Sequence, residues 1–414
     1  MIKLDDLQAL DANDPLAAYR DQFYLPNDVI YLDGNSLGAL PNRVKQRVKE
    51  TTEHQWGDDL ISSWNKHQWV NMPEQVGEKI APLIGAAKGQ VVCCDSISVN
   101  LFKLLGAAIS FNGTATRTKV ISSHDNFPTD LYVAQGLEQL LGSDRCQFVD
   151  VEEDQLGEAI DETTAVIMVT EVNFRSGKRL DIRSLAQKAK AKGAMILVDL
   201  AHSAGVMPIQ LDEWQVDMAV GCTYKYLNGG PGAPAFVYVN RALQGHLQQP
   251  IAGWLGHRSP FDFSPDYQAD SGIKQFLAGT PSIISMSAVD AALELFTDLD
   301  LQLVRNKSTK LSQLFDDLVC QFGLSNQLQR LSPADADARG SQLSYSFASA
   351  YELCQALIAR NVIADFRSPN FIRFGFAPLY NRYQDIWQAV KHLNDIIESE
   401  EYNDPRWAER QAVT

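Results

Sequence analysis

The chain has 414 residues, 45% of them hydrophobic and 21% charged, which is typical of a globular protein with one large and one smaller domain. Its formal net charge of -15 makes the surface repel phosphate backbones and anionic lipid. We therefore expect neither nucleic acid nor a membrane as a partner.

The N-terminal residues 1–50 are expected to form an arm that packs on the C-terminal domain. The first fifteen, MIKLDDLQALDANDP, are acidic where a signal peptide needs a basic region followed by an apolar one. No apolar run approaches the length of a membrane span. These features predict a cytoplasmic protein.

Residues 51–300 are expected to form the large domain, in which β-rich runs alternate with helical stretches. The runs are apolar on both faces, as strands of a covered sheet must be; they lie at 118–123, 165–173, 194–200, 217–223 and 233–239. A helical pattern at 181–193 ends in lysines and a closing glycine. The alternation predicts an α/β fold with a mostly parallel sheet covered by helices, and a ligand site at the carboxyl ends of its strands.

Residues 301–414 are expected to form a smaller α+β domain. The pattern predicts a helix at 302–322, a strand at 342–349, a helix at 350–361, a strand pair around 371–376 and a last helix at 382–399.

Two charged residues follow neighbouring apolar runs of the large domain. Asp199 ends the run AMILV and should face the ligand crevice, where an unpaired carboxylate is costly, so it needs a cationic partner. Lys225 follows the next run at the same edge of the sheet. An aspartate that holds a protonated ring nitrogen and a lysine that forms a Schiff base are the groups that pyridoxal phosphate (PLP) requires. A simple salt bridge between these two residues explains them equally well.

A candidate phosphate cradle precedes an apolar-periodic helix. Asp95, Ser96 and Ser98 stand in CCDSISVNLFKLLGAA, where free backbone N–H groups and hydroxyls can hold a dianion. Alone, this pattern is more often only a helix cap. Together with Asp199 and Lys225, it favours a PLP site.

The blocks DLAHSAG and YKYLNGGPG resemble fold-type I PLP-dependent enzymes of the aspartate aminotransferase superfamily. With YLDGNSLGALP, DSISVNLFK, DNFPTDLY, TEVNFRSG, GWLGH and RFGFAPLYN, which run in this order from 31 to 381, the chain is similar to kynureninases. The resemblance implies a hydrolase that cleaves the Cβ–Cγ bond of L-kynurenine to anthranilate and L-alanine. It also implies a place in tryptophan catabolism and NAD biosynthesis, and a homodimer with shared active sites.

The resemblance also implies roles for individual residues. Lys225 would carry PLP, Asp199 would hold the pyridinium, His202 would orient the ring, Tyr224 would bind phosphate and donate a proton, and Asp130 would be a second acidic group. The catalytic set is therefore Lys225, Tyr224, Asp199 and Asp130. Further PLP contacts would come from Ile97, Ser98, Phe127, Pro128, Thr129 and Thr170, and from Trp254 and Thr280 of the partner subunit.

For the substrate, the resemblance implies that Arg373 grips the carboxylate with its bidentate fork. Trp64 would form one wall of an apolar slot for the aromatic ring, with Gly279 nearby. Because animal members place polar residues around the 3-position of the ring, Trp64, Gly279 and Thr280 favour unsubstituted kynurenine over its 3-hydroxy form. No metal site is expected.

Three alternatives remain. A cysteine desulfurase or class V aminotransferase would share the fold, but desulfurases typically carry a histidine before the lysine and a reactive cysteine on a mobile loop; here Tyr224 precedes Lys225, and Cys320 and Cys354 are expected in helical, apolar contexts. A PLP-binding regulator would need an added basic DNA-binding domain. A degenerate structural member would have no reason to keep costly buried charges.

Overall fold

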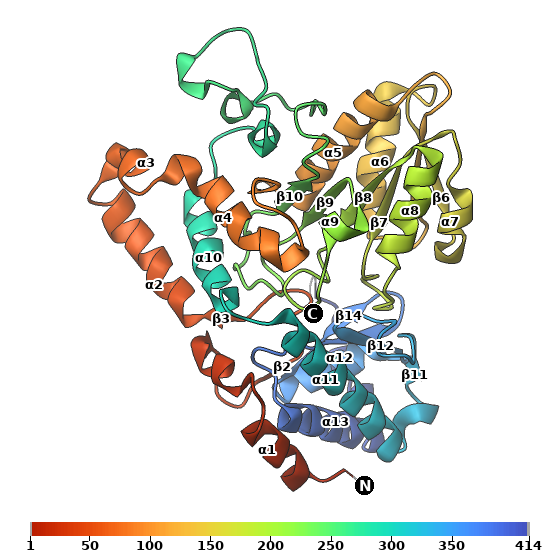
Figure 1. Cartoon of the computed structure of the whole chain (residues 1–414). Coiled ribbons are helices and arrows are strands. Elements are labelled where there is room, and N and C mark those ends of the chain that lie inside the picture. Colours follow the sequence, from red (N-terminus) through yellow and green to blue (C-terminus); the bar gives the residue numbers. More distant parts are fainter. Residues whose placement is uncertain (1, 412–414) are drawn as a thin grey trace.

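The computed structural model describes residues 2–411 and contains a large α/β domain and a smaller C-terminal domain (Figure 1). The large domain is built on a seven-stranded sheet of order β4-β10-β9-β8-β7-β5-β6. Only β10 runs antiparallel to its neighbours, so the prediction of a mostly parallel sheet is confirmed. The strands are β4 (Val91–Cys93), β5 (Lys119–Ser123), β6 (Gln147–Val151), β7 (Thr164–Thr170), β8 (Met195–Asp199), β9 (Met218–Gly221) and β10 (Phe236–Val239).

Alternation along the central strands sends apolar side chains to two separate cores. On β7, Val166 and Met168 pack in the core that α5 (Ile97–Asn112) and α6 (Pro128–Leu141) cover. Ile167 and Val169 point the other way, to the core shared with α8 (Ile182–Lys192), α4 (Met72–Ile80) and α10 (Ile283–Leu293). Because both faces are covered, β7 is buried at every position, which explains its continuous apolar run.

Two strands of the sheet were not among the predicted runs. β4 has only three residues, too few for a periodic signal, and it joins the sheet by pairing with β10. β6 is an edge strand with no fully buried residue, so its sequence QFVDV lacks the apolar continuity of the inner strands.

The smaller domain has a four-stranded antiparallel sheet of order β11-β12-β15-β14 with its own core. Phe315, Phe374 and Ile386 are among the core residues with no exposed surface or almost none. Its elements are α11 (Leu301–Gln321), β11 (Gln329–Arg330), β12 (Gln342–Ser346), α12 (Ala350–Ala359), β14 (Asp365–Arg367), β15 (Phe371–Gly375) and α13 (Tyr383–Glu398). The predicted helices and strands of this domain follow the observed order, but the two-residue strand β11 was not predicted.

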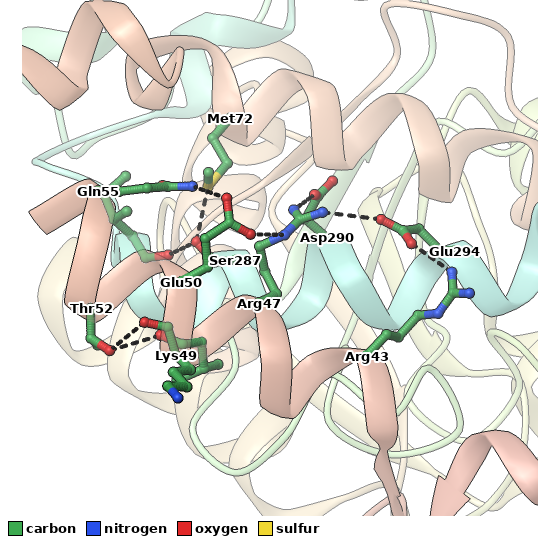
Figure 2. Close-up of polar contacts among 12 residues, drawn as sticks. Arg43, Arg47, Lys49, Glu50, Thr52, Gln55, Met72, Ser287, Asp290 and Glu294 are labelled. Carbon is green, nitrogen blue, oxygen red and sulfur yellow. Dashed lines mark hydrogen bonds and ion pairs between the residues drawn. The ribbon is translucent and has the colours of Figure 1, made fainter.

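The N-terminal fifty residues contact both domains. α1 (Leu4–Ala12) packs against α13, and β2 (Ile30–Tyr31) pairs with the short β13 (Val362–Ile363). In contrast, α2 (Asn42–Glu50) lies along α10 in the large domain, where Arg47 contacts Asp290 at 2.5 Å and Glu294 at 3.2 Å (Figure 2). The segment predicted as an arm on the small domain therefore leaves that domain before α2.

The remaining short helices of the large domain are α3 (Ser63–Lys66), α7 (Leu156–Ala159) and α9 (Leu211–Trp214). Within residues 2–411, no helix combines the length and the apolar character that crossing a membrane requires.

Candidate active site

A cavity of about 460 Å³ opens at the carboxyl ends of β7 and β8. Thr170 ends β7 and Asp199 ends β8, so the parallel arrangement brings both to one edge of the sheet. The loop after β9 adds Tyr224 and Lys225, and the start of α6 adds Asp130. Also lining the cavity are Asp95, Ser96, Ile97, Ser98, Phe127, Thr129, Phe174, Ala201, His202, Cys222, Gly232, Ala233, Pro234, Ala235 and Ser282.

Lys225 and His202 form the central contact of the cavity. The Lys225 Nζ lies 2.8 Å from the His202 Nε2, and His202 is buried. Asp199 is also buried and accepts a hydrogen bond from the Ala201 backbone N–H at 2.7 Å. Asp130 has no exposed surface, and neither of its carboxyl oxygens has a hydrogen-bond partner within residues 2–411.

Burial sets the protonation of these groups. It raises the pKa of Asp199 to about 6, although the nearby Lys225 cation opposes this shift. Burial, reinforced by the charge of Asp199, raises the pKa of Asp130 well above its ordinary value. Burial and then the Lys225 cation lower the pKa of His202, so its imidazole is neutral. Burial likewise raises the pKa of the Tyr224 phenol, which therefore stays protonated at neutral pH.

The loop between β4 and α5 forms the other end of the cavity. Ser96 caps α5 by accepting the Val99 N–H, and Ile97 and Ser98 follow in the first turn, where backbone N–H groups have no partner within the helix. Asp95 also faces this end, but the fully buried Lys103 forms an ion pair with it. Lys103 further donates to the Phe276 carbonyl at 2.7 Å. The pair neutralises the one carboxylate of this loop.

These residues fit PLP. The two partnerless oxygens of Asp130 are buried polar atoms of the kind that folded proteins rarely leave unsatisfied, so a polar ligand group in the cavity explains them. Asp199 offers a carboxylate to a protonated ring nitrogen, and Lys225 offers a primary amine. The start of α5 offers hydrogen-bond donors to a phosphate.

Several predicted site residues lie outside this cavity. Pro128 begins α6 between Phe127 and Thr129, which do line it. Trp64 is half-buried and packs edge-on against Trp69, with ring centroids 5.7 Å apart. Gly279 is exposed on the loop before α10.

Arg373 is fully buried on β15, beside the cavity rather than in it. Its Nε donates to Asp365 Oδ1 at 2.7 Å, and its other nitrogens contact Asp365 Oδ2 and the carbonyl of Phe174, a residue that lines the cavity. Arg373 is thus held by an aspartate on the neighbouring strand β14, opposite it in the register.

The remaining two predicted residues, Trp254 and Thr280, which were assigned to the partner's site, do not line the cavity of their own chain. Trp254 is 38% exposed and packs with the still more exposed Phe261 and Phe263. Thr280 lines a groove of about 1000 Å³ between α2 and α10. Ser282 lines both the groove and the cavity, so the two hollows adjoin.

The cysteines differ from expectation at one position. Cys354 is buried, as its apolar helix indicated, but Cys320 is exposed in the last turn of α11 because its side chain falls on the outer face of that helix. Neither residue lines the cavity. Cys222 does line it, yet burial raises the pKa of its thiol, which opposes formation of the reactive thiolate.

The sequence did not single out several residues around the cavity. Phe174 packs edge-on against Phe127, with ring centroids 5.2 Å apart. Gln342, from the smaller domain, has its Oε1 3.1 Å from the His202 Nδ1. Phe174 stands in the block TEVNFRSG and could have been chosen as a site residue from the sequence. The residues around Gln342 give no indication that it reaches the site.

Curated relatives match the whole chain. It is 47% identical to the kynureninase of Burkholderia pseudomallei (strain 1106a) over 413 residues, covering 99% of each protein. It is 41% identical to the kynureninase of Pseudomonas fluorescens over 416 residues, covering both completely. The chain belongs to the kynureninase family. A family model described as the kynureninase C-terminal domain also matches residues 304–393, within the smaller domain of this family member.

Solved structures share the fold at low sequence identity. The apo cysteine desulfurase of Thermococcus onnurineus NA1 has a TM-score of 0.78 at 19% identity and covers 92% of the chain and 98% of its own. A C-DES variant with glycine covalently linked to its PLP cofactor has a TM-score of 0.76 at 14% identity, covering 90% and 98%. These similarities establish a fold-type I architecture for this kynureninase family member, and the relation to desulfurases extends to the fold alone.

Proposed function

We propose that this protein is a PLP-dependent hydrolase that cleaves the Cβ–Cγ bond of L-kynurenine, consuming one water and releasing anthranilate and L-alanine. The observation that carries the proposal is the convergence of Lys225, Asp199 and His202 in one cavity of a chain that matches a kynureninase over 99% of its residues. When bound, PLP supplies a sink for the electron pair left at the substrate Cα.

Lys225 takes the proton from the substrate Cα as general base. Its Nζ reaches the cavity from the loop after β9, and the neutral His202 beside it adds no competing positive charge. Asp199 stabilises the positive charge of the ring nitrogen, because a buried carboxylate is most stable when a cation faces it.

Tyr224 is the proposed proton donor to Cβ. Once water has added to the γ-carbonyl and the Cβ–Cγ bond breaks, Cβ must take up a proton. The Tyr224 phenol holds its proton at neutral pH because burial raises its pKa. Arg373 is the proposed partner of the substrate carboxylate, which requires its fork to share or exchange the bonds to Asp365.

We also propose a cytoplasmic homodimer that acts in tryptophan catabolism. The apolar groove beside the cavity supports the dimer, since Val44, Val48 and Ile284 are among the residues that line it. In such a dimer, Trp254 and Thr280 of a second copy would complete the site. The exposed aromatic group of Trp254, Phe261 and Phe263 supports this assignment, because exposed apolar clusters commonly mark contact surfaces.

The test is to incubate the purified protein and PLP with L-kynurenine, and separately with 3-hydroxy-L-kynurenine, and to quantify the aromatic product and alanine. We expect equal amounts of anthranilate and alanine from the first substrate and a slower second reaction. A Lys225→Ala variant should lose at least about a hundredfold in rate, as expected for loss of a general base. If PLP binds but neither substrate is cleaved, the proposal fails and a desulfurase or aminotransferase screen follows.

A further inference from the structure

The smaller domain contributes one side chain to the catalytic lysine's immediate surroundings. Gln342 stands at the start of β12 with 1% of its surface exposed, and its Oε1 lies 3.1 Å from the His202 Nδ1. The opposite ring nitrogen, Nε2, lies 2.8 Å from the Lys225 Nζ. A three-residue chain therefore connects the small domain to the reactive amine.

Two backbone carbonyls fix the direction of the Gln342 amide. Its Nε2 donates to the Phe174 carbonyl at 3.0 Å and lies 3.4 Å from the Asn173 carbonyl. Because carbonyls only accept, the amide NH₂ group must face them, and Oε1 must face His202. The Nδ1 of the neutral imidazole is then the donor, and Nε2 is left as the acceptor.

This tautomer determines what happens at Lys225. Once the Lys225 cation has given up a proton, an acceptor at Nε2 takes one N–H of the neutral amine and leaves its lone pair free. In the other tautomer, Nε2–H donates to that lone pair and occupies it. The lone pair is what attacks the PLP aldehyde carbon: a C=N bond forms, and the two amine hydrogens leave with the aldehyde oxygen as water.

We propose that Gln342 is a positioning residue that holds His202 in the Nδ1–H tautomer and so keeps the Lys225 lone pair free for attachment of PLP. The proposal rests on the proposed role of Lys225 as the PLP-binding residue. Other charged or titratable groups also surround Lys225 and His202. Asp130, Asp199, Cys222 and Tyr224 lie around Lys225, and Arg367 and Arg373 lie near His202; the Gln342 variants leave all of them unchanged.

The first test measures how fast PLP attaches to the full chain after PLP has been removed, by the growth of the absorbance of the lysine-linked cofactor. Borohydride reduction and peptide mass analysis locate the attachment at Lys225. Gln342→Leu should slow attachment about tenfold, the size expected for one buried hydrogen bond. Ser344→Ala is the matched control. Ser344 lies two residues along β12, is fully buried and donates to the carbonyl of Arg175, the residue after Phe174, and it has no hydrogen bond to His202. It should attach PLP at the wild-type rate.

Gln342→Glu separates tautomer control from simple packing. A carboxylate still accepts from Nδ1–H, so attachment should approach the wild-type rate at alkaline pH. The same carboxylate raises the pKa of His202, so the rate relative to wild type should fall as the pH decreases and the imidazolium forms. If the rate of Gln342→Glu relative to wild type does not change with pH, the proposal is contradicted. This test remains valid even if Gln342→Leu fails to fold.

Nitrogen NMR of isotope-labelled histidines reads the tautomer directly, with His202→Gln assigning the His202 signals among the seven histidines. We expect a protonated Nδ1 and an unprotonated Nε2 on His202, and the reverse would overturn the proposal. The proposal would also fail if a folded Gln342→Leu variant attached PLP at the wild-type rate. If wild-type protein attaches no PLP at Lys225, the proposed function fails, and the NMR result still decides the role of Gln342.

Discussion

Burial gives Asp199 a pH-dependent effect on stability. Its pKa rises from 3.8 to about 6 on burial. Between these two values, the cofactor-free folded protein binds more protons than the unfolded chain does. The contribution of Asp199 to stability is therefore largest below the unfolded value and is lost as the pH rises through the folded one.

We predict that Asp199→Asn removes this dependence in the cofactor-free protein. Relative to wild type, the variant should gain about 2–3 kcal/mol in the free energy of unfolding between pH 4 and pH 7, because asparagine keeps the Ala201 contact without a charge. Urea unfolding at a series of pH values measures the gain. With PLP loaded, the same variant should bind the cofactor more weakly; a stability difference that is constant with pH would refute the explanation.

At the residue scale, the cavity was predictable wherever the parallel sheet alone determines position. Asp199 and Lys225 follow neighbouring runs, so their meeting required only the rule that parallel strands share a carboxyl edge. Gln342 was not predictable, because it lies 140 positions after His202 in the sequence and in the other domain. The positions of Trp64 and Gly279 outside the cavity likewise depend on packing that one sequence does not reveal.

At the scale of elements, the contact between α2 and α10 depends on a small network of charges (Figure 2). Arg47 contacts both Asp290 and Glu294, and its side chain is 30% exposed. Among residues 2–411, Arg43 forms an ion pair with Glu294 alone, at 2.5 Å, and it is more exposed than Arg47. The two arginines are one helical turn apart, so the pair offers an internal comparison.

We predict that Arg47→Ala lowers the free energy of unfolding by about 1 kcal/mol, since it removes a shared partner from two partly buried carboxylates. Arg43→Ala should cost less, because Arg43 is more exposed than Arg47 and pairs with one of these carboxylates rather than with both. Urea unfolding at low and high salt measures both effects, and the Arg47 effect should shrink with salt. Equal losses for the two variants would show that the network does not act as described.

Secondary structure was predictable where an element buries a continuous face. The helices α11, α12 and α13 and the strands β7 and β8 have such faces, and their observed bounds fall within a few residues of the predicted ones. β4 and β6 escaped prediction because three residues, or an exposed edge, leave no periodic signal. The division of the N-terminal segment between two domains also lacked a local signal.

At the scale of the whole molecule, the exposed apolar surface is concentrated near the groove and the 251–267 segment. Trp56, which lines the groove, is 57% exposed, and in the segment Phe263 is 76% exposed and Phe261 is 57% exposed. A groove of about 1000 Å³ lined largely by apolar side chains adjoins the cavity at Ser282. The proposed homodimer would cover this surface and bring Trp254 of the second copy to the site.

Mixing two variants that we expect to be inactive on their own tests this shared site. Lys225→Ala lacks the reactive amine, and Trp254→Ala lacks the aromatic side chain proposed to come from the other copy. After subunit exchange, half of the dimers are mixed, and each mixed dimer has one site with both Lys225 and Trp254 intact. The mixture should therefore regain about a quarter of the wild-type activity, as random pairing in a two-fold dimer requires. If Trp254 instead served the site of its own chain, no site in the mixed dimer would be intact and no activity would return. In the control mixture, Lys225→Ala is combined with Leu10→Ala, a change at an exposed position on α1, in place of Trp254→Ala.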